Sequence, residues 1–142
     1  MRCDEVMSRE VQSVRQRDTV LAAAKLMRHA NVGFLPVSDD DGRVVGALTD
    51  RDIVVRLAAD GRDWHTPIGD IMTTELVSCR PHDGLEIAEQ LMRAHHTARV
   101  VCVDDDGRAR GVVSLSDVAR NDDPIVVAET LGEIVTREPS PR

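Results

Sequence analysis

The sequence predicts an α+β protein built from two copies of one βαββα unit of about fifty residues. Three observations lead to this fold class. The chain repeats itself at a constant spacing of 65 positions, each copy has an amphipathic helical stretch between short apolar runs, and each copy has the same acidic turn. One register persists through all of these segments, so chance similarity does not explain the repeat.

The repeat can be aligned without a gap by placing Met7 on Met72. In that register residues 7–55 match residues 72–120. The longest identical run is Asp-Asp-Asp-Gly-Arg, which occurs at 39–43 and again at 104–108. Such a run predicts a hairpin turn, because Asp and Gly tolerate positive φ angles.

Each copy contains the same expected elements in the same order. A short strand comes first, at 11–15 or 76–80, and an amphipathic helix follows it. Strands at 34–38 and 44–48, or at 99–103 and 109–113, flank the acidic turn. The last strand leads into a helix that starts near Thr49 or Ser114. The apolar stripes of the amphipathic helices are Val20, Ala23, Ala24 and Met27 in the first copy, and Leu85, Ala88, Leu91 and Met92 in the second.

We divide the chain into a first repeat (1–60), a linker (61–67), a second repeat (68–121), a C-terminal helix (122–136) and a frayed tail (137–142). Thr66-Pro67 predicts a short helix that ends at Met72. The C-terminal helix carries an apolar stripe that needs a packing partner, formed by Ile125, Ala128, Leu131 and Val135. Neither repeat alone offers a convincing core, so we expect both to pack as one pseudo-twofold module.

The composition excludes several classes of protein. A net charge of −7 opposes binding to a phosphate backbone, and Phe34 and Trp64 are too few aromatics for base-stacking platforms, so no nucleic-acid partner is expected. No apolar run approaches membrane-spanning length and no signal peptide is visible, which predicts a soluble cytoplasmic protein without a membrane partner. No catalytic motif occurs, so we do not expect an enzyme.

We expect no metal site. The three cysteines, Cys3, Cys79 and Cys102, have neither disulfide-framework nor zinc-knuckle spacing, and Cys79 and Cys102 are interpreted as small core residues. The acidic turns lack the ligand spacing of a calcium loop. Adjacent His95 and His96 point to different faces of a helix and do not share an ion.

A Ser/Thr-x-x-Asp motif stands at the start of the last helix in each repeat, as Thr49 to Asp52 and as Ser114 to Asp117. One interpretation is a capping box, in which the hydroxyl and the acid satisfy free backbone amides. The other is a nucleotide contact, with the hydroxyl near phosphate and the acid accepting from ribose hydroxyls. In that second case Gly46 or Gly111 lets a planar base approach the backbone.

The sequence resembles a tandem pair of CBS (cystathionine-β-synthase-type) domains, also called a Bateman module, and is similar to stand-alone bacterial pairs such as hypoxic response protein. The resemblance covers nearly the whole chain. The segments that carry it are Val6-Met7, Val11 to Val14, Leu35-Pro36-Val37 and Gly46 to Ile53 in the first copy, and Ile71-Met72, Leu76 to Cys79 and Gly111 to Val118 in the second.

The resemblance implies an adenosyl ligand between the two repeats: AMP, ADP, ATP, S-adenosylmethionine or NAD. Asp52 and Asp117 would hold ribose, Thr49 and Ser114 would face phosphate, and Leu35-Pro36 would line the adenine slot. The remaining candidate contacts are Gly46, Arg51, Arg99 and Gly111. Arg99-Val100-Val101 replaces Phe34-Leu35-Pro36 in the second copy, which suggests two inequivalent sites.

The function implied by the resemblance is a regulatory nucleotide sensor that needs no cofactor and acts through a homodimer or an unidentified target protein. The alternative is a ligand-free interaction module in which both Ser/Thr-x-x-Asp motifs are helix caps alone.

Overall fold

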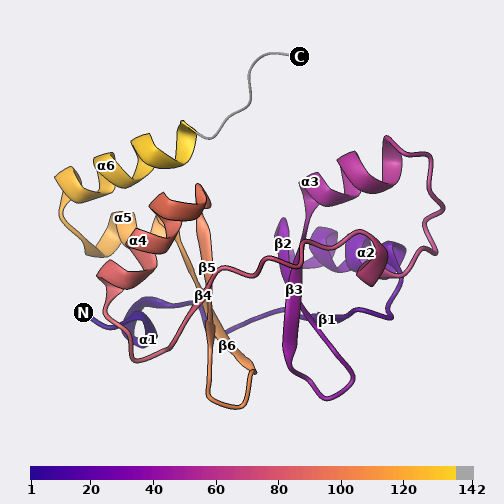
Figure 1. Cartoon of the computed structure of the whole chain (residues 1–142), viewed down its shortest axis with the longest axis horizontal. Coiled ribbons are helices and arrows are strands. Elements are labelled where there is room, and N and C mark those ends of the chain that lie inside the picture. Colours follow the sequence, from indigo (N-terminus) through magenta and orange to yellow (C-terminus); the bar gives the residue numbers. More distant parts are fainter. Residues whose placement is uncertain (137–142) are drawn as a thin grey trace. The chain divides into compact units, whose positions relative to one another are not determined.

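The computed structural model describes residues 1–136 and forms two compact units (Figure 1). The first-repeat unit contains Val11–Leu76 with Asp105–Ala109. The second-repeat unit contains Met1–Glu10, Val77–Asp104 and, within the described residues, 110–136. Each unit holds one three-stranded sheet with helices, so the predicted α+β class and the duplicated unit are confirmed.

The sheet of the first-repeat unit has the order β1-β2-β3, formed by Val14–Arg15, Phe34–Ser38 and Val44–Thr49. β1 lies parallel to β2, and β2 lies antiparallel to β3 through the predicted hairpin, whose Gly42 has a φ of 82°. β1 ends at Arg15 as predicted, where the Arg15 amide donates to the Asp18 carboxylate (2.9 Å) and the chain turns toward the next helix. It begins at Val14 rather than at Val11, because its pairing with β2 covers only Val14 and Arg15.

The helices of the first-repeat unit follow the predicted order. α2 (Val20–Ala30) begins at Thr19, whose hydroxyl accepts from the Ala22 amide, and ends at Asn31 in the left-handed conformation. β3 enters α3 (Asp50–Asp52), which continues into the π-helical η1 (Ile53–Ala58). The short helix predicted up to Met72 is a single 3₁₀ turn, η2 (Ile68–Asp70), that begins after Pro67 rather than at Thr66.

The second-repeat unit repeats this plan with β4 (Ser78–Cys79), α4 (Leu85–His95), β5 (Arg99–Val103), β6 (Ala109–Ser114) and α5 (Leu115–Asn121). Its sheet has the order β4-β5-β6, and Gly107 has a φ of 81° in the second acidic turn. This unit also contains a short helix, α1 (Cys3–Val6), which was not predicted from the sequence.

Each compact unit has its own buried core, and each core takes residues from both sequence repeats, in agreement with our expectation that neither repeat alone would form one. Ile68 and Ile71, beyond the first repeat, complete the core of the first-repeat unit. Cys3 and Met7, ahead of the strands of the first repeat, complete the core of the second-repeat unit. The compact units therefore divide the chain differently from the sequence repeats.

The C-terminal helix α6 (Pro124–Val135) lies beside α4 (Figure 1). The predicted apolar stripe does not make this contact, since Ile125, Leu131 and Val135 are 70%, 47% and 52% exposed. The inner face instead carries Val127, Ile134 and the buried Thr130, whose hydroxyl accepts from Arg93 at 2.9 Å. The predicted frayed tail lies outside the described residues.

None of the helices within residues 1–136 is long and apolar enough to cross a membrane.

A buried acid lies on α4. Glu89 is 2% exposed, and its Oε1 atom has no hydrogen-bond partner within the described part of the chain. Burial, followed by a hydrogen bond with Asp122, raises the pKa of Glu89 from 4.5 to about 7. Glu86 adds to this rise and Arg93 opposes it. The same hydrogen bond lowers the pKa of Asp122, as expected if protonated Glu89 donates to the Asp122 carboxylate.

We predict that Glu89 makes the folded state less stable as pH rises between 4.5 and about 7. In this window the unfolded chain loses the Glu89 proton before the folded chain does, so ionisation favours unfolding. Glu89→Gln should flatten the dependence and raise the free energy of unfolding by about 1 kcal/mol near pH 8. Urea denaturation across this range measures the pH dependence of the free energy of unfolding, with exposed Glu75→Gln as control. Identical slopes for Glu89→Gln and the wild type would contradict the assignment.

Candidate functional site

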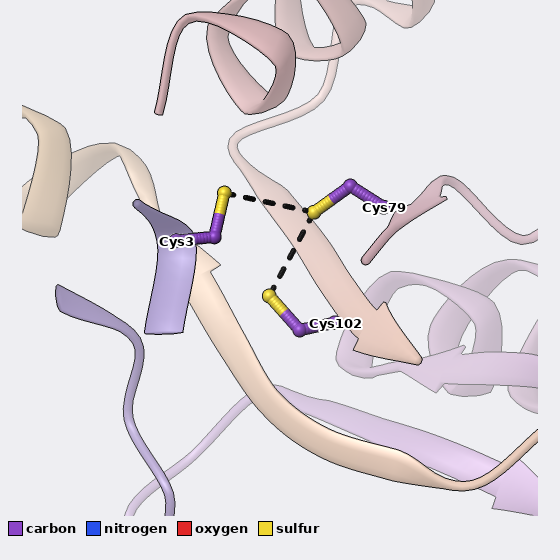
Figure 2. Close-up of side chains that lie close together, drawn as sticks. All are labelled: Cys3, Cys79 and Cys102. Carbon is purple, nitrogen blue, oxygen red and sulfur yellow. Dashed lines mark hydrogen bonds between the residues drawn. The ribbon is translucent and has the colours of Figure 1, made fainter. Parts of the chain in front are cut away.

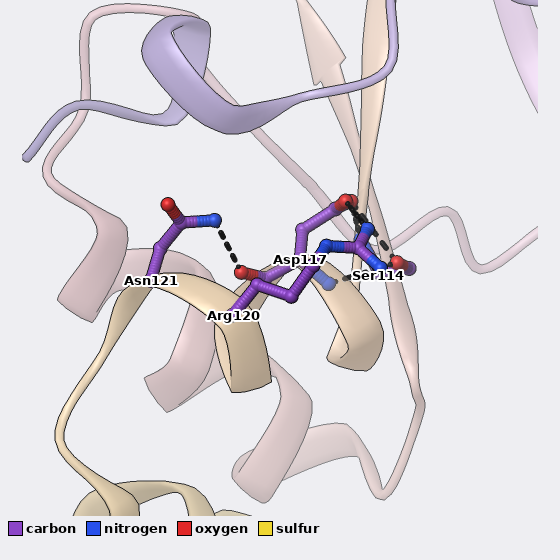
Figure 3. Close-up of polar contacts among 4 residues, drawn as sticks. All are labelled: Ser114, Asp117, Arg120 and Asn121. Atoms are coloured by element: carbon purple, nitrogen blue, oxygen red, sulfur yellow. Dashed lines mark hydrogen bonds and ion pairs between the residues drawn. The ribbon is translucent and has the colours of Figure 1, made fainter.

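The predicted capping boxes are present at both strand-to-helix junctions. In the first-repeat unit the Asp52 amide donates to the Thr49 hydroxyl (3.1 Å), and the Thr49 amide donates to the Asp52 carboxylate (3.0 Å). In the second-repeat unit the Asp117 amide donates to the Ser114 hydroxyl (3.3 Å), and the Ser114 amide donates to Asp117 (2.8 Å; Figure 3). The cap interpretation is therefore confirmed in both copies.

The two carboxylates have different further partners. The Thr73 hydroxyl lies 3.2 and 3.3 Å from the two carboxylate oxygens of Asp52, and Asp52 is only 8% exposed. Asp117 instead forms an ion pair of 2.9 Å with Arg120, whose side chain is 69% exposed (Figure 3). An exposed pair of this kind contributes at most about 1 kcal/mol. Arg120 is therefore held only weakly on Asp117.

Neither of these partners was identified from the sequence. Thr73 is 21 positions away from Asp52 and reaches it only in the folded chain. Arg120 is three positions after Asp117 on one helix, so the spacing alone could have suggested the pair. The residue that matches Arg120 in the first repeat is Val55, which is 47% exposed and carries no charge.

The two predicted glycines lie where another segment of the same unit packs against the strand. A Cβ at Gly46 would lie 2.5 Å from the Thr73 carbonyl oxygen, and one at Gly111 would lie 2.8 Å from that of Ser8. Thr73 pairs with Ala47 through two backbone hydrogen bonds of 2.9 Å, and Ser8 pairs with Val112 in the same way. The backbone at Thr73 and at Ser8 lies too close to the strand for a side chain, which accounts for glycine at both positions.

The other predicted contacts are divided between core and surface. Leu35 and Pro36 are buried in β2, opposite Leu48 and Ala47 of β3. Arg51 is exposed in the first turn after Thr49. Arg99 is exposed at the start of β5, next to Ala98, whose carbonyl accepts from the Leu115 amide at the beginning of α5 (2.8 Å).

The side chains around the two helix starts differ in charge. The second-repeat unit has Arg120 on Asp117 and Arg99 beside the helix start, with uncharged Leu115 and Ser116 between Ser114 and Asp117. The first-repeat unit has Asp50 and Asp52 with Arg51 in the same turn, and Arg56 donates to the Met72 carbonyl (3.2 Å) beside Thr73. The two aspartates therefore differ in their direct partner, which is the cation Arg120 at Asp117 and the neutral Thr73 at Asp52.

Comparison with known proteins places this arrangement in a family. The CBS domain family matches residues 3–59 and 68–124, and the chain therefore belongs to it as a tandem pair. The CBS domain-containing protein YhcV of Bacillus subtilis is 44% identical over 117 residues, which are 82% of each chain. Hypoxic response protein 1 of Mycobacterium tuberculosis is 32% identical over 118 residues, again 82% of each chain.

Solved structures agree with this assignment. Hypoxic Response Protein I with two coordinated zinc ions is 31% identical, with a TM-score of 0.77 over 87% of this chain and 100% of that one. The CBS domain pair of protein MJ0100 with 5′-methylthioadenosine and S-adenosyl-L-methionine is 25% identical, with a TM-score of 0.75. The match covers 84% of this chain and 94% of that one. CBSX2 with AMP is 26% identical, with a TM-score of 0.72, and the match covers 84% of this chain and 93% of that one.

We predict that Gly46→Ala destabilises the protein by about 1–3 kcal/mol, because the added methyl group meets the carbonyl oxygen of Thr73, a residue held by two backbone hydrogen bonds to Ala47. Thermal unfolding of the purified variant measures the loss. Gly132→Ala is the matched control, since a Cβ there meets nothing within 4 Å in a helix and should be neutral or stabilising. Equal stability of Gly46→Ala and the wild type would show that the contact is not constrained.

Proposed function

We propose that this protein is a regulatory module that binds an adenosyl ligand, such as AMP, ADP, ATP, S-adenosylmethionine or NAD, through Asp52 and Asp117. The observation that carries the proposal is the repeated carboxylate at a strand-to-helix junction in both copies of a CBS pair. Adenosyl ligands in the solved pairs of MJ0100 and CBSX2 support the ligand class.

The assigned roles follow the chemistry of each side chain. Asp52 and Asp117 accept from ribose hydroxyls, and Thr49 and Ser114 face phosphate. Leu35, Pro36, Gly46 and Gly111 belong to the strands that flank these groups. Ribose at Asp52 has to replace the Thr73 hydroxyl, whereas ribose at Asp117 has to displace the exposed Arg120.

The two sites are proposed to prefer different ligands. Arg120 and Arg99 favour a ligand with several phosphates at Asp117, since a released guanidinium pairs well with phosphate oxygens. Near Asp52, Val55 stands in place of Arg120 and Asp50 adds a negative charge, while the Arg56 guanidinium is held by the Ile71 and Met72 carbonyls rather than by Asp52. AMP or an uncharged adenosyl group is therefore better suited to that site.

The signal is proposed to pass through a homodimer or a target protein. Ligand binding shifts the protein toward one conformation only as far as the two conformations differ in affinity. The exposed stripe of Ile125, Leu131 and Val135 on α6 supports a contact with a second copy. A cytoplasmic location is part of this proposal, supported by an odd number of cysteines outside any disulfide-framework spacing.

The alternative is a ligand-free interaction module without catalytic activity. One observation favours it: the capping boxes together with Thr73 and Arg120 already satisfy both carboxylates. In that case the acids only stabilise helix starts, and nucleotides have no effect on the protein.

We predict that Asp52→Ala and Asp117→Ala each reduce the rise in melting temperature that adenosyl ligands cause, and that the double variant loses it. A ligand at about 100 times its Kd stabilises by about 2.7 kcal/mol, whereas loss of a cap costs about 1 kcal/mol with or without ligand. Thr19→Ala is the matched control, because it removes the cap of α2 and leaves both aspartates in place. An undiminished shift in the double variant would refute these roles.

A further inference from the structure

All three cysteines of the chain meet in the core of the second-repeat unit (Figure 2). Cys3 comes from α1, Cys79 from β4 and Cys102 from β5. The Sγ atom of Cys79 lies 3.8 Å from that of Cys3 and 3.7 Å from that of Cys102. All three Sγ atoms lie within 4.8 Å of one another, and the residues are 0%, 7% and 0% exposed.

The first repeat provides an internal comparison for this cluster. Spaced by 65 positions, Cys79 matches Val14, Cys102 matches Val37 and Cys3 matches Ile68. These three residues are buried in the core of the first-repeat unit. The fold therefore needs only apolar side chains here, and packing alone does not require sulfur at three converging positions.

The spacing of the sulfur atoms suits a single metal ion. Metal–thiolate bonds of about 2.3 Å place three sulfurs about 4 Å apart around an ion in their plane. The observed separations of 3.7 and 3.8 Å are close to this value, so coordination requires little movement. Within residues 1–136 no histidine or carboxylate joins the group.

The donor set indicates the kind of metal. Thiolate is a soft ligand that selects Cu(I), zinc or iron–sulfur centres. Structural zinc sites take four ligands in a tetrahedron, and this cluster supplies three. A monovalent soft ion that accepts low coordination is therefore the best match. We propose that Cys3, Cys79 and Cys102 form a binding site for one Cu(I) ion in the core of the second-repeat unit.

Metal binding changes the protonation of the cluster. Binding is a ligand exchange without redox change: copper stays monovalent, and each sulfur that becomes a thiolate releases one proton to solvent.

The site goes beyond the proposed function, because it fixes α1 to the sheet rather than binding a nucleotide. A bound ion would join α1 to β4 and β5. Ser8, just beyond α1, pairs with Val112 next to Gly111. Copper would thereby stabilise the segment that packs against the strand leading to Ser114 and Asp117.

The test is an anaerobic titration of the reduced full chain with Cu(I) in competition with a chromogenic copper(I) chelator. We expect one Cu(I) per chain, thiolate-to-copper charge-transfer absorption and a higher melting temperature. The triple variant Cys3→Ile, Cys79→Val and Cys102→Val carries the residues of the first repeat, so it should fold and lose the copper. Cys102→Val alone removes one of the three ligands and should weaken binding by more than the roughly tenfold loss typical of an outer-shell partner. This single variant tests the site if the triple variant does not fold.

His95→Asn is the control for adventitious binding, since His95 lies outside the cluster, and it should retain the copper. The proposal would be overturned if the wild type retained no more copper than the cysteine variants do. Tighter binding of Zn²⁺ than of Cu(I) through the same cysteines would overturn the choice of metal. A disulfide formed in air, with no uptake of copper by the reduced protein, would identify a redox pair instead and would also overturn it.

Discussion

Each compact unit depends on a β-strand that enters a helix through two reciprocal hydrogen bonds between a hydroxyl residue and an aspartate. The bonds satisfy amides that the first helical turn leaves free, so the strand and the helix can follow each other without a loop. Just upstream, Gly46 and Gly111 leave room for an extended segment that pairs with the same strand. This pairing places Thr73 on Asp52 and brings α1 to the second-repeat unit.

The elements that local sequence determines were predicted closely. β2 and β5 have the predicted bounds, and α6 (Pro124–Val135) lies within the segment 122–136 that was expected to form the C-terminal helix. α1 was missed because four residues give too little periodicity to recognise a helix. β1 and β4 are shorter than expected mainly at their starts, because the parallel pairing of each strand covers only two residues. β4 also ends one residue early, where the Arg80 amide donates to the Asp83 carboxylate. The inner face of α6 includes Thr130, which counts as polar in a pattern yet packs against Arg93.

In the candidate site, too, only contacts between residues close in the sequence were predicted. The capping boxes follow from a spacing of three residues and were predicted from the sequence. The contact of Thr73 with Asp52 joins residues that only the fold brings together. The cysteine cluster likewise joins positions 3, 79 and 102, and it depends on the assignment of α1 to the second-repeat unit. The two units differ chemically where the repeat pairs a charged or sulfur-containing residue with an apolar one, as at Arg120 and Val55 or at Cys79 and Val14.

The most direct test of the account is calorimetric titration of the full-length protein with AMP, ADP, ATP, S-adenosylmethionine and NAD in turn. A regulatory module that uses Asp52 and Asp117 to hold ribose should give saturable heat with at least one of these ligands. Absence of binding heat with all five, at millimolar concentration, would contradict the account and leave the two aspartates as helix caps alone.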